Sequence, residues 1–340
     1  MWFLFLNHSK PLEGEVLRKI SLISTIALIV TILLALQSCV SAATNLTIPT
    51  ASNENVTVYF LDVGQGDAIL VKTANNAVLI DGGPRSAGSV LMGYLNTYGV
   101  QKIDLLFATH PHEDHIGGLV TVLQSAIPVT IVVYNGVNYT TQVFNDFETL
   151  ASTHNLTIAS RNQIYALTPT INFTVLSPTL PLQFSVNSFN ENSIVLKLQV
   201  VDVSVLLTGD GTNETEASML ATELNLDSNV LKVGHHGSSS STSQAFLSAV
   251  TPTYAVICVG ADNSYGHPTQ QTLDRLVANS ITVFRTDTNG TIIMDLTAAA
   301  PNPTVVVPEF PTLTIVVVMM LASTIVGVKV NKILHQKQCK

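Results

Sequence analysis

The sequence predicts an α/β protein in which helices cover layered sheets. Its apolar runs are short, rich in β-branched residues and bounded by Gly, Pro, Asn or Asp, which is the pattern of β-strands. Between several of these runs, apolar residues recur at three- and four-residue spacings, as on one face of a helix. Strands that alternate with covering helices favour a layered α/β architecture.

The predicted strands cover residues 56–63, 68–73, 77–83, 104–110, 130–135, 173–178, 193–200, 203–210, 229–236, 254–260, 281–286 and 291–296. The predicted helices cover residues 87–99, 214–224, 241–250 and 269–280. Two of the strands, "AVLIDGG" and "VSVLLTGD", both end in Gly and Asp and could be equivalent strands of two similar halves. Coincidence is the alternative, because many strands end this way.

The N-terminal part has the layout of an export signal. Only 11% of all residues are charged and 46% are hydrophobic, so membrane segments are expected. Residues 20–37 form an uncharged apolar run that follows basic residues and precedes small ones, as in a secretory signal. An uncleaved anchor is the alternative, because the run is long enough to span a bilayer. Residues 1–43 are therefore predicted as a signal peptide or N-terminal membrane anchor, and residues 44–56 as a polar spacer.

The C-terminal part has the layout of a membrane anchor. We expect a Pro-rich stalk over residues 298–311, a transmembrane segment over 312–328 and a basic cytoplasmic tail over 329–340. Because positive charge after a span tends to stay inside, the domain over residues 57–297 would lie outside the cell, anchored in its membrane. The motif "VPEFP" with this span and tail resembles PEF-type sorting signals of archaeal surface proteins; a plain stop-transfer anchor is the alternative.

Two further features agree with export. Acceptor triplets for N-glycosylation occur at Asn7, Asn45, Asn55, Asn138, Asn155, Asn172, Asn213 and Asn289. The three cysteines are Cys39, Cys258 and Cys339, and two of them lie at or near the expected membrane segments, so no disulfide framework is available. Cys258, in "YAVICVG", is predicted to be a buried strand residue and not a nucleophile.

The stretch "FATHPHEDHIGG", residues 107–118, indicates a metal site. His110 and His112 flank a single residue, so both can face the same ion. Asp114 and His115 follow at once and can face a second ion. Imidazole and carboxylate ligands suit zinc, and also manganese or iron.

Two later strands end in further candidate ligands. "LLTGD" ends at Asp210, whose two carboxylate oxygens could bridge two cations. "LKVGHHGS" ends in His235 and His236, and spacing does not decide which of them is a ligand. Strands that deliver such residues from their carboxyl ends to one edge of a sheet would form a compact site.

These motifs, in this order, resemble the metallo-β-lactamase superfamily, and most closely the C-terminal hydrolase domain of ComEC-type DNA-uptake proteins. "YFLDVGQGDAILVKT", "VLIDGGP", "ENSIVLKL", "VLLTGD", "LKVGHHGS" and "SYGHP" carry the resemblance, over about residues 57–296. It implies a four-layer αββα fold and two divalent ions, zinc or alternatively manganese, with no nucleotide cofactor. The implied ligands are His110 and His112 for one ion, Asp114, His115 and His236 for the other, and Asp210 as the bridge.

One position departs from the superfamily pattern. Most members carry another histidine before the "TGD" strand, where this chain reads "FNENSIVL". Asn190, Glu191, Asn192 or water could fill that place, or only one ion could bind. At most two membrane spans are expected, so the chain is not expected to form a DNA channel itself.

The resemblance implies a hydrolase that uses a metal-bound hydroxide. Asp114 would orient the nucleophile, and His235 or His267 would protonate the leaving group. The turn Asp62–Asp67 is expected beneath the site, and Asp81 either supports a ligand or caps a turn. A phosphodiesterase or nuclease acting on DNA or another phosphodiester is favoured. The alternatives are hydrolysis of another ester, amide or lactam, and a surface binding module with an incomplete metal site.

The charge of the outer domain opposes nucleic-acid binding. Residues 56–300 contain 8 Lys and Arg against 19 Asp and Glu, a net charge of −11. Proteins that bind nucleic acids usually present a basic face to the phosphates. Two bound ions would add positive charge locally, which favours a short or single-stranded substrate. Few aromatic residues are placed along the sequence to stack bases.

Overall fold

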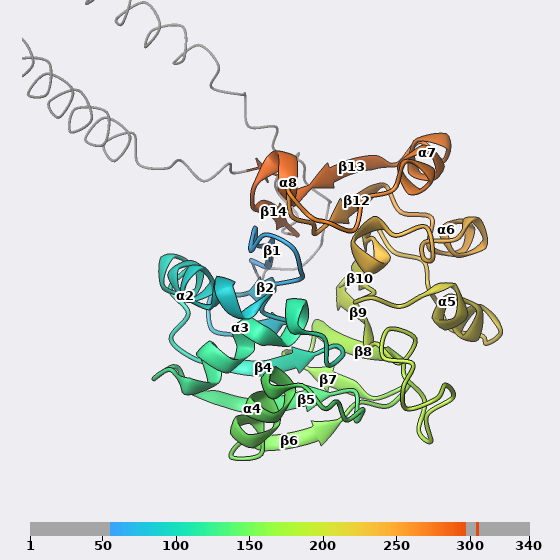
Figure 1. The fold of residues 1–340 in the computed structure, drawn as a ribbon. Helices are drawn as coiled ribbons and strands as arrows, with labels where there is room; N and C mark the ends of the chain where they lie inside the picture. Colours follow the sequence, from blue (N-terminus) through green and yellow to red (C-terminus); the bar gives the residue numbers. More distant parts are fainter. Residues whose placement is uncertain (1–54, 297–303, 306–340) are drawn as a thin grey trace, which may run out of the picture. The chain divides into compact units, whose positions relative to one another are not determined.

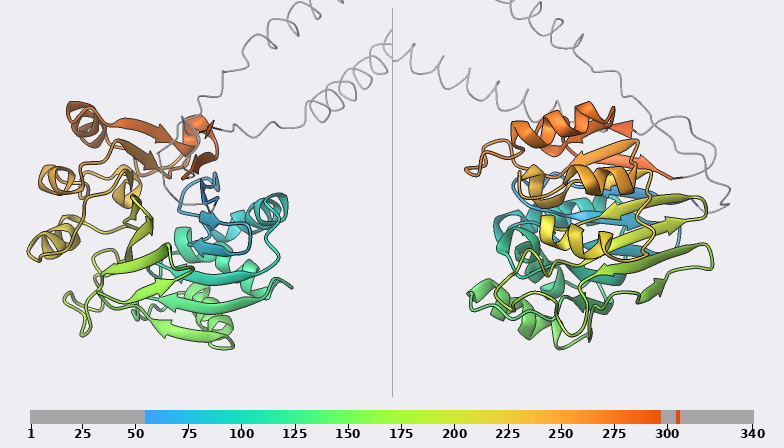
Figure 2. Two further views of the ribbon diagram at one scale, coloured as in Figure 1. Left: turned by 180° about the vertical axis from the view of Figure 1, so that it is seen from behind. Right: turned by 90° about the vertical axis from the view of Figure 1, so that its right-hand side faces the viewer.

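Two β-sheets lie face to face in the computed structural model, which describes residues 55–296 and 304–305. Each sheet has helices on its outer face, so the order of layers is helix, sheet, sheet, helix (Figures 1 and 2). The predicted αββα layering is therefore confirmed.

The first sheet has the strand order β15-β14-β1-β2-β3-β4-β5-β6. Strands β1 to β3 pair antiparallel, whereas β3 to β6 pair parallel. The carboxyl ends of the parallel strands therefore meet at one edge of the sheet. The bounds are β1 Thr57–Phe60, β2 Ile69–Lys72, β3 Ala77–Ile80, β4 Ile103–Ala108, β5 Val129–Tyr134, β6 Asn155–Ile158, β14 Ile292–Asp295 and β15 Thr304–Val305.

The second sheet has the order β13-β12-β11-β10-β9-β8-β7. Strands β7 to β10 pair antiparallel, and β10 to β13 pair parallel. The bounds are β7 Ile164–Ala166, β8 Ile171–Ser177, β9 Val195–Val200, β10 Val203–Leu207, β11 Val230–Lys232, β12 Tyr254–Ile257 and β13 Thr282–Arg285.

The two sheets repeat one pattern. In each, a run of antiparallel strands leads into a parallel set, and β3 and β10 stand at the change of direction. These are the strands of "AVLIDGG" and "VSVLLTGD". The expectation that they are equivalent strands of similar halves is confirmed by the topology.

Helices cover both outer faces. The first sheet carries α2 (Gly88–Thr97), α3 (Glu113–Gln124) and α4 (Gln142–Ala151), and the second carries α5 (Asn213–Leu220), α6 (Gln244–Val250) and α7 (Gln270–Ala278). The short helix α8 (Thr286–Asn289) follows β13. The four predicted helices are present with shifted ends, whereas α3, α4, β6, β7 and β15 were not predicted.

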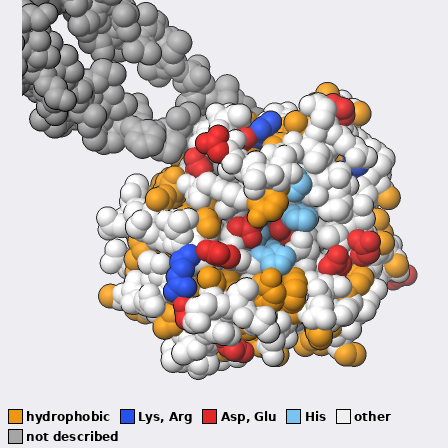
Figure 3. All heavy atoms as spheres, viewed as in Figure 1, with side chains coloured by type: hydrophobic (Ala, Val, Ile, Leu, Met, Phe, Trp, Pro, Cys, Tyr) orange, Lys and Arg blue, Asp and Glu red, His pale blue; other side chains and the backbone are white. Residues whose placement is uncertain are grey.

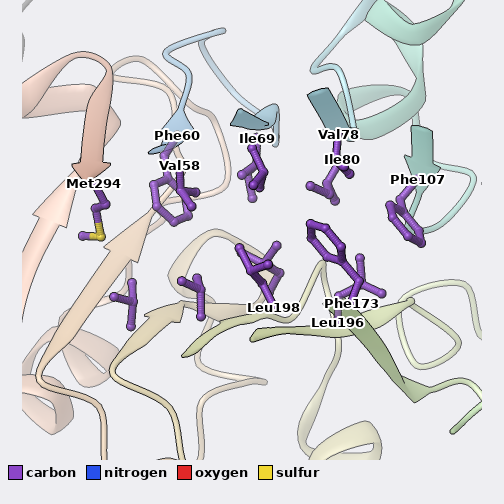
Figure 4. Close-up of a cluster of buried hydrophobic side chains, with 14 of the residues drawn as sticks. Val58, Phe60, Ile69, Val78, Ile80, Phe107, Phe173, Leu196, Leu198 and Met294 are labelled. Carbon is purple, nitrogen blue, oxygen red and sulfur yellow. The ribbon is translucent and has the colours of Figure 1, made fainter. Parts of the chain in front are cut away.

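The core between the sheets follows from the alternation of side chains along each strand. In β3, Val78 and Ile80 face the second sheet, whereas Leu79 packs under the helices of the first layer. Figure 4 shows this inner layer, with Val78 and Ile80 opposite Phe173 and Leu196. Because both faces of the central strands are buried, the sheets form a rigid frame for the loops at their ends.

The expected signal, spacer, stalk and transmembrane segment lie outside the described residues, apart from Asn55 and Val56 of the spacer and the short strand β15 within the stalk range. Within the described part of the chain, no helix is long and apolar enough to cross a membrane. The assignments of both termini therefore stay predictions.

Candidate metal centre

The carboxyl end of β4 delivers the first group of candidate ligands. His110 and His112 lie in the short connection after β4, and Asp114 and His115 lie in the first turn of α3. Nε2 of His110 is 3.0 Å from Nδ1 of His112. The helix turns Asp114 and His115 to the same side as the two preceding histidines, which explains how four ligands fit within six residues.

The second sheet supplies the remaining candidate ligands. Asp210 follows β10, and His236 follows β11. The Asp210 carboxylate lies 3.8 Å from Nε2 of His110, 3.3 Å from Nε2 of His115 and 3.4 Å from Nε2 of His236. The structure therefore places Asp210 between the two groups of imidazoles, and Nε2 of His236 is also 3.3 Å from Oδ2 of Asp114.

Partners on the outer ring nitrogens orient the buried histidines. Nδ1 of His115 donates to Asp81 at 2.8 Å, and Nδ1 of His236 donates to the carbonyl of Cys258 at 2.8 Å. Nδ1 of His110 is 3.1 Å from Oγ1 of Thr109, which itself donates to Asp81 at 2.7 Å. Each Nε2 is thereby directed toward Asp210, which is the orientation that metal-binding histidines use.

Asp81 thus supports a ligand. The side chain of Asp81 is buried, and its backbone has a φ of 57°. Its carboxylate accepts hydrogen bonds from both the backbone amide and the hydroxyl of Thr109. Burial raises the pKa of Asp81, although the contact with His115 opposes this shift. The sequence left two roles open for Asp81, support of a ligand or capping of a turn. Its contact with His115 favours the first.

A buried ion pair lies beneath the site and was missed by the sequence analysis. Nζ of Lys232, in β11, is 2.5 Å from Oδ2 of Asp67 and donates to the carbonyl of Gly209 at 2.9 Å. Both side chains are buried. Burial alone would favour their neutral forms, but their contact lowers the pKa of Asp67 and raises that of Lys232. A lysine within the apolar run "VLKV" was the available signal.

The turn containing Asp67 reaches the site through a close backbone contact. The backbone amide of Asp67 donates to the carbonyl of Asp114 at 3.1 Å. At the preceding Gly66, with a φ of 131°, a Cβ would lie 2.0 Å from that same carbonyl oxygen. Only glycine allows this approach, so the turn 62–67 lies beneath the site as expected.

The site attracts positive charge. Burial alone would lower the pKa values of His115 and His236, but the surrounding carboxylates raise both well above the usual range. Burial lowers the pKa of His110, so this imidazole stays neutral. Protons on His115 and His236 would thus occupy the place of a cation, and metal binding would release them.

The pair His235–His236 is held in a strained backbone conformation. Both residues have positive φ values, 48° and 52°, which side-chain-bearing residues rarely adopt. The strain turns the two rings in different directions. The side chain of His236 is 2% exposed and lies in the cluster, whereas that of His235 is 27% exposed and lies 3.7 Å from Asp210. The geometry therefore favours His236 as the ligand and leaves His235 facing the cleft.

The other candidate residues divide between the cleft and the scaffold. Nδ2 of Asn190 lies 3.3 Å from Nε2 of His235, and Asn190 lines the cleft. Asn192 is buried and donates to two carbonyls of its own loop. The carbonyl of Glu191 accepts from Thr215. Cys258 is buried, and burial raises the pKa of its thiol, so it is a core residue as expected.

An open cleft of about 830 Å³ lies over the cluster, lined by His112, Asp114, Asp210, His235, His236 and His267 among others. Figure 3 shows the exposed histidines in a hollow, with acidic side chains between them and hydrophobic side chains on either side. A substrate can therefore reach the ligand cluster from solvent.

The residues present fit a divalent metal. Among the described residues, three groups of His and Asp side chains, all of which include His115, each have ligand atoms within 4.8 Å of one another. Oδ1 of Asp210 is buried and accepts no hydrogen bond within the described structure, as expected of an oxygen that a cation should contact. The donor set of imidazole and carboxylate suits zinc or manganese.

Two packed sheets between helices, with a His and Asp cluster at the carboxyl ends of their strands, define the αββα class of metal-dependent hydrolase folds. The chain belongs to the metallo-β-lactamase superfamily, whose family profile matches residues 61–261. Members of this superfamily are generally metal-dependent hydrolases.

Comparison with known proteins finds relatives among competence proteins. The chain is 34% identical to ComE operon protein 3 of Bacillus subtilis over 257 residues, covering 69% of this chain and 32% of that protein. It is 35% identical to the competence protein ComA of Neisseria gonorrhoeae over 249 residues, covering 72% and 33% respectively. The chain thus spans about a third of these relatives. Among solved structures, the metallo-β-lactamase fold protein YhfI from Bacillus subtilis matches with a TM-score of 0.46 and 12% identity, covering 71% of this chain and 99% of YhfI.

Proposed function

We propose that this protein is an exported, membrane-anchored, metal-dependent phosphodiesterase that acts on nucleic acids. The observation that carries the proposal is the convergence of His110, Asp114, His115, Asp210 and His236 beneath an open cleft. The similarity to ComE operon protein 3 and competence protein ComA, together with the resemblance of the motifs to the hydrolase domain of DNA-uptake proteins, supports a phosphodiester substrate.

The ligands would form two sites that share one carboxylate. His110, His112 and Asp210 would hold one ion, and Asp114, His115, His236 and Asp210 the other. When bound, such ions lower the pKa of a water molecule and stabilise charge on phosphate oxygens. The first site has no third imidazole, so we expect it to bind its ion more weakly than the second.

The chain's own residues would supply orientation and protons. The side chain of Asp114 is 27% exposed, so its carboxylate can accept a hydrogen bond from the attacking water. His235 and His267 both line the cleft, and their ring centroids are 5.7 Å apart. Either imidazole can donate a hydrogen bond to the leaving oxygen and transfer the proton as the ester bond breaks.

The test is a substrate panel with the full-length chain loaded with zinc or manganese. Single-stranded DNA, double-stranded DNA, bis-p-nitrophenyl phosphate and the lactam nitrocefin separate phosphodiester from amide chemistry. We expect hydrolysis of the phosphodiesters and loss of both hydrolysis and bound metal in Asp210→Ala. Cleavage of nitrocefin alone, or hydrolysis that survives this substitution, would contradict the proposal. A metal-loaded chain without activity on any ester, amide or lactam would instead favour a binding module.

A further inference from the structure

The fold brings aromatic rings to both ends of the imidazole cluster. Tyr139 and Phe189, whose ring centroids are 4.4 Å apart, lie 5.8 and 5.6 Å from the ring of His112. At the opposite end, the ring of Tyr265 stacks on His267 at 6.0 Å and 20°. Tyr139 and Phe189 are distant from Tyr265 in the sequence, which is why few aromatic residues were expected near the site.

The rings form one continuous row. The row runs from His112 through His110, His115, His236, His235 and His267 to Tyr265. The centroids of successive rings in this order are 4.7, 4.1, 5.2, 6.1, 5.7 and 6.0 Å apart. The proposed metal ligands occupy the middle of this row, and the larger aromatic rings occupy its two ends. Figure 3 shows hydrophobic side chains on both sides of the exposed histidines.

Tyr265 is exposed but its loop is tied down. Its side chain is 67% exposed and it lines the cleft. Asn263 closes the loop by donating to the carbonyls of Gly260 and His267 and accepting from the amide of His267. The backbone amide of Gly260 in turn donates to the side chain of Gln65. A large aromatic face is therefore held open to solvent beside the ligand cluster.

Within the described cleft, no lysine or arginine side chain is available to contact phosphates. The lysines and arginines of the described domain all form ion pairs or hydrogen bonds within the protein, and none of them is among the described residues that line the cleft. These residues are Lys72, Arg85, Lys102, Arg161, Lys197, Lys232, Arg275 and Arg285. Inside the cleft, affinity for a nucleic acid would therefore come from the bound ions and from contacts to bases.

We propose that Tyr265 and the Tyr139–Phe189 pair stack on unpaired nucleobases, so that the substrate is single-stranded nucleic acid. This inference rests on the proposed phosphodiesterase function and names its substrate class. A base is accessible to such a ring only when it is unpaired, because in a duplex its faces are covered by neighbouring bases. Stacking on aromatic side chains is independent of base identity and is strong enough to orient a strand without cationic contacts.

The test compares a short single-stranded oligonucleotide containing 2-aminopurine with one in which an abasic residue replaces it, using the full-length chain with zinc or manganese. Quenching of the 2-aminopurine fluorescence reports stacking without requiring hydrolysis. The ratio of kcat/KM for the two oligonucleotides reports the contribution of the base. We expect quenching and a preference of roughly 5- to 150-fold for the base-containing strand, the size of one stacked base.

Variants at Tyr265 separate stacking from a structural role. Tyr265→Phe is expected to keep the quenching and the preference, and Tyr265→Leu to lose most of both through a higher KM. Val277→Ala, at an equally exposed position on α7 outside the cleft, is the matched control and should behave as the unaltered chain. Retention of quenching and preference in Tyr265→Leu, or equal quenching by a duplex, would overturn the proposal.

Two outcomes distinguish this inference from the function on which it rests. Equal hydrolysis of both oligonucleotides without quenching would refute stacking and leave the phosphodiesterase intact. Quenching that depends on Tyr265 without any hydrolysis would support stacking and refute the phosphodiesterase. Because no free lysine or arginine lines the described cleft, log KM should also depend only weakly on log salt concentration; a steep dependence would refute the argument from charge.

Discussion

Replacing Lys232 by Met tests whether the buried ion pair holds the floor of the site. The substitution removes the ammonium 2.5 Å from Asp67 and its hydrogen bond to Gly209, but keeps the unbranched shape of the side chain. Both members of the pair are buried, so Asp67 would be left as an uncompensated charge. Removing one partner of a buried pair costs about 3–5 kcal/mol. For a domain of this size the melting temperature should fall by roughly 6–20 °C.

The matched control is Lys102→Met. Lys102 also pairs with an aspartate, Asp104, at 2.8 Å, but its side chain is 54% exposed. Solvent screens such a pair, so its loss should cost less than about 1 kcal/mol. The two substitutions change the same residue type in the same way and differ in burial.

The assay is urea unfolding of the full-length chain followed by circular dichroism, in the presence of a chelator. The chelator is required because a bound metal stabilises the folded state by mass action and would mask the loss. In the double variant Asp67→Asn with Lys232→Met, the loss should be smaller than the sum of the two single losses by more than about 1 kcal/mol. A Lys232→Met chain as stable as the Lys102→Met control would refute the reasoning, as would strict additivity with Asp67→Asn.

Three further predictions concern the candidate ligands and the turn beneath them. His236→Ala should lose an equivalent of bound zinc, whereas His235→Ala should keep its zinc and lose about 10²–10⁴-fold in kcat. Elemental analysis and initial rates test this assignment, and loss of metal in both variants would contradict it. Asp81→Asn should weaken zinc binding by about 10- to 100-fold because a ligand imidazole loses its carboxylate partner, and unchanged affinity in a chelator competition would contradict this. Gly66→Ala should lower the urea midpoint strongly, because its Cβ would lie 2.0 Å from a backbone oxygen. In the control Gly93→Ala nothing lies within 4 Å of the new Cβ, so the higher helix propensity of alanine should raise the midpoint slightly. Similar midpoints in both variants would contradict the geometry.

The sequence allowed the strands and the convergence of the candidate ligands to be predicted, because both follow from local pattern. Each run of β-branched residues became a strand, and the side chains that end β4, β10 and β11 meet at the site as expected. The order of the motifs was sufficient to choose the fold class. The choice between His235 and His236 needed the structure, because it depends on two strained backbone conformations that spacing does not encode.

Helix α3 was missed because its sequence contains two adjacent glycines, which lower helix propensity. The structure gives the reason for them. A Cβ at Gly117 would lie 2.2 Å from the backbone amide of Arg85, and one at Gly118 would lie 2.0 Å from the carbonyl of Gly82. The helix that carries Asp114 and His115 thus packs directly against the loop after β3. Close packing between distant segments overrides local propensity here and is not visible in the sequence.

The pairing of Lys232 with Asp67 was missed for a related reason, since it joins the ends of two different sheets. It explains how an acidic protein can bring four carboxylates, Asp67, Asp81, Asp114 and Asp210, to one small region. One buried ammonium neutralises only part of their charge, and the rest demands cations. The same cations would attract a phosphate into a cleft whose described lining offers no lysine or arginine. The negative charge that opposes nucleic-acid binding in the metal-free protein therefore becomes the reason why binding would depend on metal.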